Sequence, residues 1–437
     1  MFLKNRTSLL MLTVCVFLAV SGVGLAANEV TTIRYLTHSV LEEPSRTIIL
    51  DGIKKFEELH PNIKIEVEAV PNEQVSQKVV TYARSGMLPD VVGLQAMGIE
   101  PMASEGHLLD ITDRVMADKL DEEFFDLECA TGLDGKMYGL PLYGATDALY
   151  FNPDLFKDVG LDPDNPPKTW DELLNYAIQL TKPEIGQYGM GLYGKPVHAI
   201  RAEHYMSNAG PEGRILRLNR EKNNTWDILV NSPDSLKAWR YLRRFVDEGA
   251  VPPNTAELAY PDLISLFAQG KVAMITTGPW GMATIKAANP DATFNISQHP
   301  TPTGEMPTLR VAPLVTAISA NTQYPDEAYE FLKFLTIDIG VEMAAAGYGA
   351  LTQTAANDPR VKDNPYMSIF AEQQKYAYFS APEMLLPEWL RCRDQGWGVA
   401  WQEMLIGTLT PEKAVSQAAK KIKEILGDKG NLIYPVE

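Results

Sequence analysis

An alternation of strand-like and helix-like patterns over residues 32–92 limits this chain to few folds. Residues 32–36 form a short β-type run, and residues 49–59 carry apolar side chains at helical spacing up to Pro61. Residues 63–68 alternate between apolar and charged side chains, as in a half-buried strand, and a second helical stripe and a third short strand follow. This order predicts a parallel sheet covered by helices, and therefore an α/β fold.

The rest of the chain continues the alternation. Thr169 and Glu172 form a capping box at a predicted helix start, and apolar stripes predict helices over residues 233–246, 326–335 and 411–425. The ~410 residues that follow a predicted signal peptide are too many for one compact core, so we expect two lobes. Proline and glycine are spread along the chain rather than gathered in one linker, so we expect the chain to cross between the lobes more than once.

The first 26 residues have the pattern of a secretory signal peptide. Lys4 and Arg6 precede an apolar run over residues 9–20, and small residues follow it. The run is too short for a membrane anchor, which needs ~20 apolar residues. Cys15 follows Val14, whereas a lipid-attachment cysteine follows a small residue, so we favour a soluble mature protein and leave the anchor open. The predicted location is periplasmic or extracellular.

The net charge and the cysteine content limit the partners and the covalent links that we expect for this chain. The formal net charge of −17 argues against nucleic acid, and it favours an uncharged or cationic ligand only weakly. Beyond the signal peptide the chain keeps Cys129 and Cys392, which an exported protein could join in a disulfide. We favour two thiols because these residues belong to segments that we assign to different lobes, but the sequence leaves their pairing open.

Several motifs typical of catalysis or cofactor binding are incomplete or absent in this sequence. Gly189, Gly191 and Gly194 spell GxGxxG, but Pro196 follows Lys195 where a phosphate loop needs serine or threonine. The chain has no GxSxG elbow and no HExxH pair, and its six histidines show no metal-ligand spacing. We therefore predict no cofactor, no metal and no enzymatic activity. A secreted glycoside hydrolase stays an alternative, because the separation of two carboxylates cannot be read from sequence.

Seven short motifs stand out, in this order: FEELHPNIK at residues 56–64, SGMLPDV at 85–91, DGKMYGLP at 134–141, LYFNPDLF at 149–156, TWDEL at 169–173, FAQGKVAM at 267–274 and GPW at 278–280. With these motifs the chain resembles the extracellular solute-binding proteins of carbohydrate ABC importers (family 1, maltose-binding-protein-like) from about residue 32 to 426. The resemblance implies a two-lobe periplasmic-binding-protein fold with interlobe hinge strands, and a ligand cleft that closes around its ligand.

The motifs also suggest where the lobes meet. We expect a first crossover at residues 143–146, where Gly144 supplies backbone freedom, and a return over residues 311–319. The predicted hinge residues are Gly144, Ala145 and Thr316. The predicted boundaries are these: signal peptide 1–26, lobe I 27–145 and 317–348, lobe II 146–316 and 349–437.

Sugars bind in clefts through aromatic faces and polar side chains. Trp280 follows Gly278 and Pro279 at a predicted strand end, and the resemblance implies that it stacks on a sugar; a core tryptophan is the alternative. Trp397 falls near another aromatic position of that family's cleft. Loop or strand-end positions add the other candidate ligand-binding residues: His38, Glu42, Glu43, Gln95, Asp147, Tyr193 and Tyr348.

The resemblance implies the substrate-binding component of an ABC importer, a monomer that captures a sugar, oligosaccharide or polyol and delivers it to the permease membrane subunits. A maltodextrin ligand is not favoured, because Leu94 or Gln95 stands where that family places a stacking tryptophan. Four arginines keep an anionic ligand such as glycerol phosphate as an alternative: Arg201, Arg214, Arg217 and Arg391. A sensory binding module is a further alternative. The sequence does not name the sugar, its length or its anomer.

Overall fold

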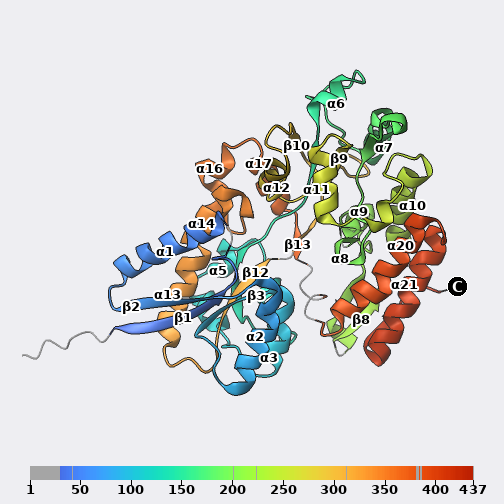
Figure 1. The fold of residues 1–437 in the computed structure, drawn as a ribbon. Coiled ribbons are helices and arrows are strands. Elements are labelled where there is room, and N and C mark those ends of the chain that lie inside the picture. Colours follow the sequence, from blue (N-terminus) through green and yellow to red (C-terminus); the bar gives the residue numbers. More distant parts are fainter. Residues whose placement is uncertain are drawn as a thin grey trace, which may run out of the picture.

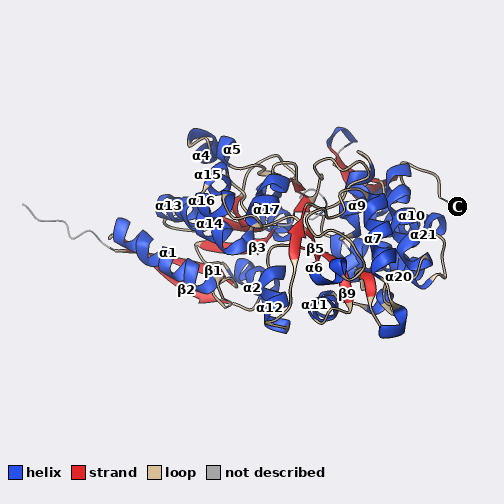
Figure 2. Cartoon of the chain, turned by 90° about the horizontal axis from the view of Figure 1, so that it is seen from above, coloured by secondary structure: helices blue, strands red, loops and turns tan. Residues whose placement is uncertain are grey.

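The computed structural model describes residues 30–436 except Glu42, Ile200, Asn223, Ala312, 380–382 and 384–385. The predicted signal peptide and the candidate Glu42 therefore lie outside the described residues. Two sheets of different strand order organise the chain. In Figure 1 the first sheet lies at the left, and α10, α20 and α21 lie at the right. Figure 2 shows the same division from above, with β5 between the two halves.

The first sheet has the order β2-β1-β3-β12-β4. Its strands are β1 (Thr31–Thr37), β2 (Ile63–Ala69), β3 (Val91–Gln95), β4 (Gly139–Tyr143) and β12 (Leu314–Ile318). The parallel pairing of β1 with β2 and β3 confirms the predicted strand–helix–strand arrangement. β12 runs antiparallel between β3 and β4, so the sheet is mixed.

Helices of this half include α1 (Ser45–Leu59), α2 (Asn72–Ser85), α3 (Ile99–Ser104), α4 (Thr112–Ala117), α5 (Leu120–Glu123), α13 (Pro325–Thr336) and α14 (Asp338–Met343). Phe331 of α13 packs on Phe56 of α1 at 5.2 Å and on Tyr35 of β1 at 5.5 Å, so both helices cover one face of the sheet. The predicted stripe of α1 is buried except at its end. Leu59 is 60 % exposed, because the helix ends there, beyond the sheet.

The second main sheet has the order β10-β5-β9-β6 and a smaller one the order β14-β8-β7. Their strands are β5 (Ala148–Phe151), β6 (Tyr188–Met190), β9 (Val272–Thr277), β10 (Asn295–Ser297), β7 (Leu216–Asn219), β8 (Thr225–Ile228) and β14 (Gly430–Leu432). The helices around them are α6 (Pro153–Lys157), α7 (Trp170–Leu180), α8 (Pro196–Ala199), α9 (Ala202–Ala209), α10 (Pro233–Asp247), α11 (Tyr260–Ala268), α12 (Gly281–Ala288), α19 (Trp389–Arg391), α20 (Gly398–Ile406) and α21 (Pro411–Leu426).

The chain passes between the two sheets at several places. Residues 144–147 join β4 to β5, and a turn over Ala344–Tyr348 leads from α14 to α15 (Gln353–Asn357). The remaining elements of this region are α16 (Pro359–Lys362), α17 (Met367–Gln374) and the paired strands β11 (Arg310–Val311) and β13 (Tyr378–Phe379). β12 already belongs to the first sheet at Leu314, and Thr316 lies in its middle. The exact lobe boundaries stay a prediction.

The glycines of the GxGxxG pattern allow backbone segments to pack closely. A Cβ on Gly189 would lie 1.9 Å from the carbonyl oxygen of Ala177, and one on Gly194 would lie 2.1 Å from that of Thr255. Both glycines therefore let backbone segments touch, which accounts for the pattern without a phosphate. Cys129 and Cys392 are buried free thiols. Among the described residues, no helix combines the length and apolar character needed to cross a bilayer.

Candidate ligand-binding site

A buried ion pair lies where the chain enters the second sheet. Asp147 directly precedes β5, and its Oδ2 lies 2.9 Å from Nε of Arg201 and 3.6 Å from Nδ1 of His204. The Asp147 side chain is 4 % exposed and that of Arg201 16 %. Burial opposes the charge of Arg201 most strongly, but the Asp147 carboxylate together with Tyr193 and Tyr260 outweighs burial and raises the arginine's pKa. The guanidinium therefore keeps its charge beside Asp147.

The guanidinium of Arg201 lies over two tyrosine rings. Tyr193 follows β6 and Tyr260 begins α11; their rings are 6.2 Å apart with an interplanar angle of 11°. The guanidinium carbon lies 4.6 Å from the ring centre of Tyr193 and 5.4 Å from that of Tyr260. Tyr193 also donates its hydroxyl proton to the carbonyl oxygen of Thr276, which fixes its ring. We call Asp147, Tyr193, Arg201, His204 and Tyr260 the Arg201 cluster.

Two further histidines beside the cluster are neutral at neutral pH. Burial, helped by Arg201 and other cations, lowers the pKa of His198 to about 4. Burial and the neighbouring His204 lower the pKa of His299 to about 3. Gln373 donates hydrogen bonds of 3.2 Å to Thr146 and to the carbonyl oxygen of Asp147, and accepts one of 2.7 Å from the backbone of His299. This network holds the entering strand in place.

Trp280 lies at the same edge of the sheet. It follows β9, whose last residue Thr277 pairs with Ala148 beside Asp147. Its side chain is 37 % exposed, so the ring is accessible. Thr284 links Trp280 to the Arg201 cluster. The Thr284 hydroxyl lies 3.0 Å from the hydroxyl of Tyr260, and it donates a hydrogen bond of 3.1 Å to the carbonyl oxygen of Trp280. Trp280 is thus connected to Tyr260 of the cluster through Thr284.

The predicted residues of the first half meet the crossing segments. The hydroxyl of Tyr143 lies 3.2 Å from Nε2 of His38, and its ring contacts that of Tyr348 at 5.1 Å. Gly144 donates its backbone N–H to the carbonyl oxygen of Tyr348 at 3.1 Å. His38, Tyr348 and the predicted hinge residue Gly144 therefore belong to one contact region, and Ala145 follows in it.

Other candidates lie apart from these contacts. Gln95 ends β3 and pairs with Leu314, while the carboxylate of Glu43 accepts a hydrogen bond from the backbone of Thr47. Trp397 is fully buried in the turn Cys392–Trp397, so a ligand would reach its ring only if its neighbours moved. The roles of these residues in binding stay predictions.

The sequence did not single out Tyr260, His198 or Gln373, and it considered Arg201 only as a possible anion site. No local signal marks these residues, because their partners come from distant segments; Asp147 and Arg201 are 54 residues apart. Within the described residues, no group of three or more His, Cys, Asp or Glu side chains is arranged to hold a metal ion.

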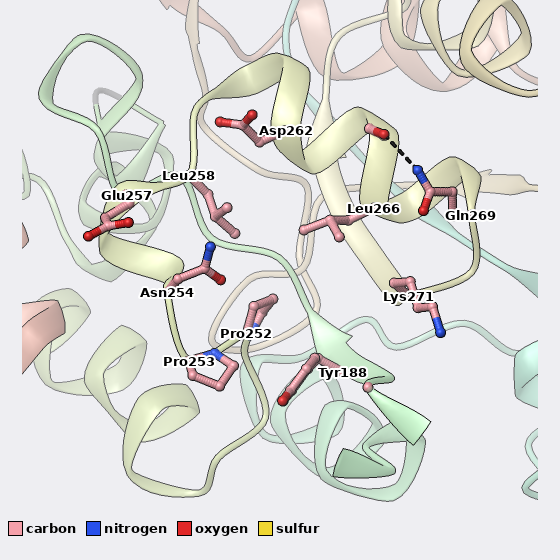
Figure 3. Close-up of a pocket in the computed structure, with 12 residues that line it drawn as sticks. Tyr188, Pro252, Pro253, Asn254, Glu257, Leu258, Asp262, Leu266, Gln269 and Lys271 are labelled. Atoms are coloured by element: carbon pink, nitrogen blue, oxygen red, sulfur yellow. Dashed lines mark hydrogen bonds between the residues drawn. The ribbon is translucent and has the colours of Figure 1, made fainter. Parts of the chain in front are cut away.

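A separate groove lies at the amino ends of β6 and β9. It has a volume of about 730 Å³ and is lined by apolar residues such as Pro252 and Leu266 and by charged ones such as Glu257 and Lys271. Figure 3 shows Glu257 and Lys271 toward opposite ends of this hollow. Asp147 and Trp280 lie at the other end of β9, where the chain crosses between sheets. None of the sequence-predicted ligand residues lines the groove, so the crossing region is the better candidate site.

Comparison with known proteins identifies the family. Residues 41–342 match the model of the bacterial extracellular solute-binding proteins. A putative binding protein of Brucella abortus is 28 % identical over 85 % of this chain and 88 % of its own. The galactooligosaccharide-binding protein of Bacillus subtilis is 25 % identical over 86 % of both chains.

Solved structures agree with this result. The solute-binding protein of an ABC transporter from Thermotoga lettingae, solved with α-D-tagatose, has a TM-score of 0.71 and 25 % identity over 91 % of this chain and all of its own. The predicted two-lobe α/β fold and the resemblance inferred from the seven motifs are thus confirmed. The chain belongs to the bacterial extracellular solute-binding protein family.

Proposed function

We infer that this protein captures a sugar, oligosaccharide or polyol between its two lobes and delivers it to the membrane subunits of an ABC importer. It works as a monomer outside the cytoplasmic membrane, in the periplasm or extracellular space, and releases its ligand chemically unchanged. The relatives that bind a galactooligosaccharide and α-D-tagatose support this ligand class.

The observation that carries the proposal is the surface formed by Trp280 and the Arg201 cluster. The exposed ring of Trp280 offers a flat apolar face to the C–H side of a sugar, and Arg201 offers N–H donors to its oxygens. Both lie where the chain crosses between the lobes. A ligand held there contacts both lobes only when they approach each other, so binding shifts the population toward the closed form.

Thermal unfolding with a ligand panel tests this function. Mono-, di- and trisaccharides, polyols, glycerol phosphates and amino acids are added at about 1 mM each. A ligand with a Kd of ~1 μM stabilises the folded state by ~4 kcal/mol and raises the melting temperature by several degrees. If no sugar or polyol moves the transition, the proposed ligand class is wrong.

Substitution of Trp280 tests the site. We expect Trp280→Ala to weaken binding of the sugar found in the panel by roughly tenfold or more, measured by titration calorimetry. Tyr324→Ala is the matched control, because Tyr324 is also an exposed aromatic residue, 41 % against 37 %, but precedes α13 in the other lobe. Equal affinities of wild type and Trp280→Ala would remove Trp280 from the site.

A further inference from the structure

Arg201 keeps hydrogen-bond donors for a ligand. Its guanidinium carries five N–H groups, and Nε donates to Asp147 at 2.9 Å. Among the described residues, this is the one hydrogen bond that the side chain makes within the protein. The guanidinium also contacts the rings of Tyr193 and Tyr260, which restrict its movement. The group is thus pre-positioned to bind oxygen acceptors.

The charge of Arg201 is balanced before any ligand arrives. Asp147 compensates it at contact distance, and the histidines beside it, His198 and His299, have pKa values lowered to about 4 and about 3. The nearby Arg393 has its own carboxylate, with Nε 2.7 Å from Asp394. Lys195 and Asp262, which also act on His198, are exposed to solvent and carry opposite charges. Arg201 and Arg393 therefore each have a carboxylate at contact distance.

We propose that Asp147 sets the charge selectivity of the site, so that Arg201 hydrogen-bonds an uncharged hydroxylated ligand and the site discriminates against its anionic analogue. An anion would lose its hydration there without gaining an uncompensated positive charge. Hydroxyl and ring oxygens lose little and accept the free N–H donors. This inference rests on the proposed function. It also argues against glycerol phosphate as the ligand, since Asp147 already engages Arg201.

The test compares pairs of compounds that differ in charge: D-glucose with D-glucuronate, D-galactose with D-galacturonate, and sorbitol with gluconate. Affinities are measured by titration calorimetry at one salt concentration. For wild type we expect the neutral member of the bound pair to bind at least tenfold more tightly. In Asp147→Asn, Arg201 loses its counter-charge, and we expect the ratio to move toward the acid by roughly tenfold or more.

Asp227→Asn is the matched control. Asp227 is also a buried carboxylate, 5 % exposed, and it pairs with Arg217 at 3.3 Å, but it lies on β8 in the small sheet. Removing it changes a buried ion pair in the same lobe without touching the Arg201 cluster. The ratio of neutral to acidic ligand should therefore stay at the wild-type value in Asp227→Asn.

A second variant covers misfolding of Asp147→Asn. Arg201→Gln leaves Asp147 without its cation, so we expect the cationic D-glucosamine to gain at least tenfold relative to D-glucose. An unchanged ratio in a folded Asp147→Asn, an unchanged glucosamine ratio in Arg201→Gln, or a wild-type preference for the acid overturns the charge-selectivity proposal and leaves solute binding intact. If wild type binds no sugar, polyol or sugar acid in the pairs or the panel, the proposed function itself fails.

Discussion

Replacing Gly349 by alanine tests how closely the two crossing segments approach. Gly349 has φ 85° and ψ 142°, a conformation that residues with a side chain rarely adopt. A Cβ there would lie 2.1 Å from the carbonyl oxygen of Gly144 and 2.8 Å from Cβ of Ala145. A carbonyl oxygen cannot rotate away as a flexible side chain can, so the crossing segments themselves must separate.

Two costs add up in this variant. The unfavourable backbone conformation costs roughly 1–3 kcal/mol. The collision with Gly144 adds about 1–3 kcal/mol, as other forced overlaps in packed regions do. We therefore expect Gly349→Ala to lower the free energy of unfolding by roughly 2–6 kcal/mol. Gly86→Ala separates the two costs, because Gly86 also has a positive φ of 70° but would place its Cβ in open space. That control should lose only about 1–2 kcal/mol.

Urea unfolding followed by tryptophan fluorescence measures both variants against wild type. We expect Gly349→Ala to lose at least ~1 kcal/mol more than Gly86→Ala. The sugar found in the panel should also bind more weakly to Gly349→Ala, because the displaced segments carry Tyr348 and lead to Asp147. If the two variants lose equal stability and Gly349→Ala keeps wild-type affinity, the close approach does not constrain the crossing region.

Two more outcomes follow from burial. Folding lowers the pKa of His299 from 6.5 to about 3. Between these pH values the unfolded chain binds a proton at His299 and the folded chain does not, so the free energy of unfolding should decrease as pH falls from about 6.5 toward 3. In urea titrations at several pH values, the free energy of unfolding of His299→Asn should decrease less steeply with falling pH than that of wild type. An equal slope for both proteins would contradict the lowered pKa of His299. Burial raises the pKa of Cys129 and brings that of Cys392 to about 12, so both thiols should react with a thiol reagent only on unfolding. Rapid labelling of the folded protein, or a mapped disulfide between them, would contradict it.

Local patterns predicted much of the fold because they depend on neighbours in the chain. The capping box of Thr169 and Glu172 is present at the start of α7 as expected, and Gly86 ends α2 in the left-handed conformation. Each of these signals needs only a few consecutive residues. Leu59 fits the helical period of α1 but is exposed, because periodicity does not show where the sheet beneath a helix ends.

The candidate site was harder to predict from sequence, because its residues come from distant segments of the chain. Asp147 was placed near the cleft from its position beside the first crossover, but nothing in that segment identifies Arg201 as its partner. The fold brings them together by placing Arg201, the residue directly before α9, within 2.9 Å of Asp147, the residue directly before β5. The whole chain is strongly acidic, with a net charge of −17, whereas Arg201 is paired with a single carboxylate, that of Asp147. Ligand selectivity therefore depends on which charges are paired, and pairing follows from topology rather than composition.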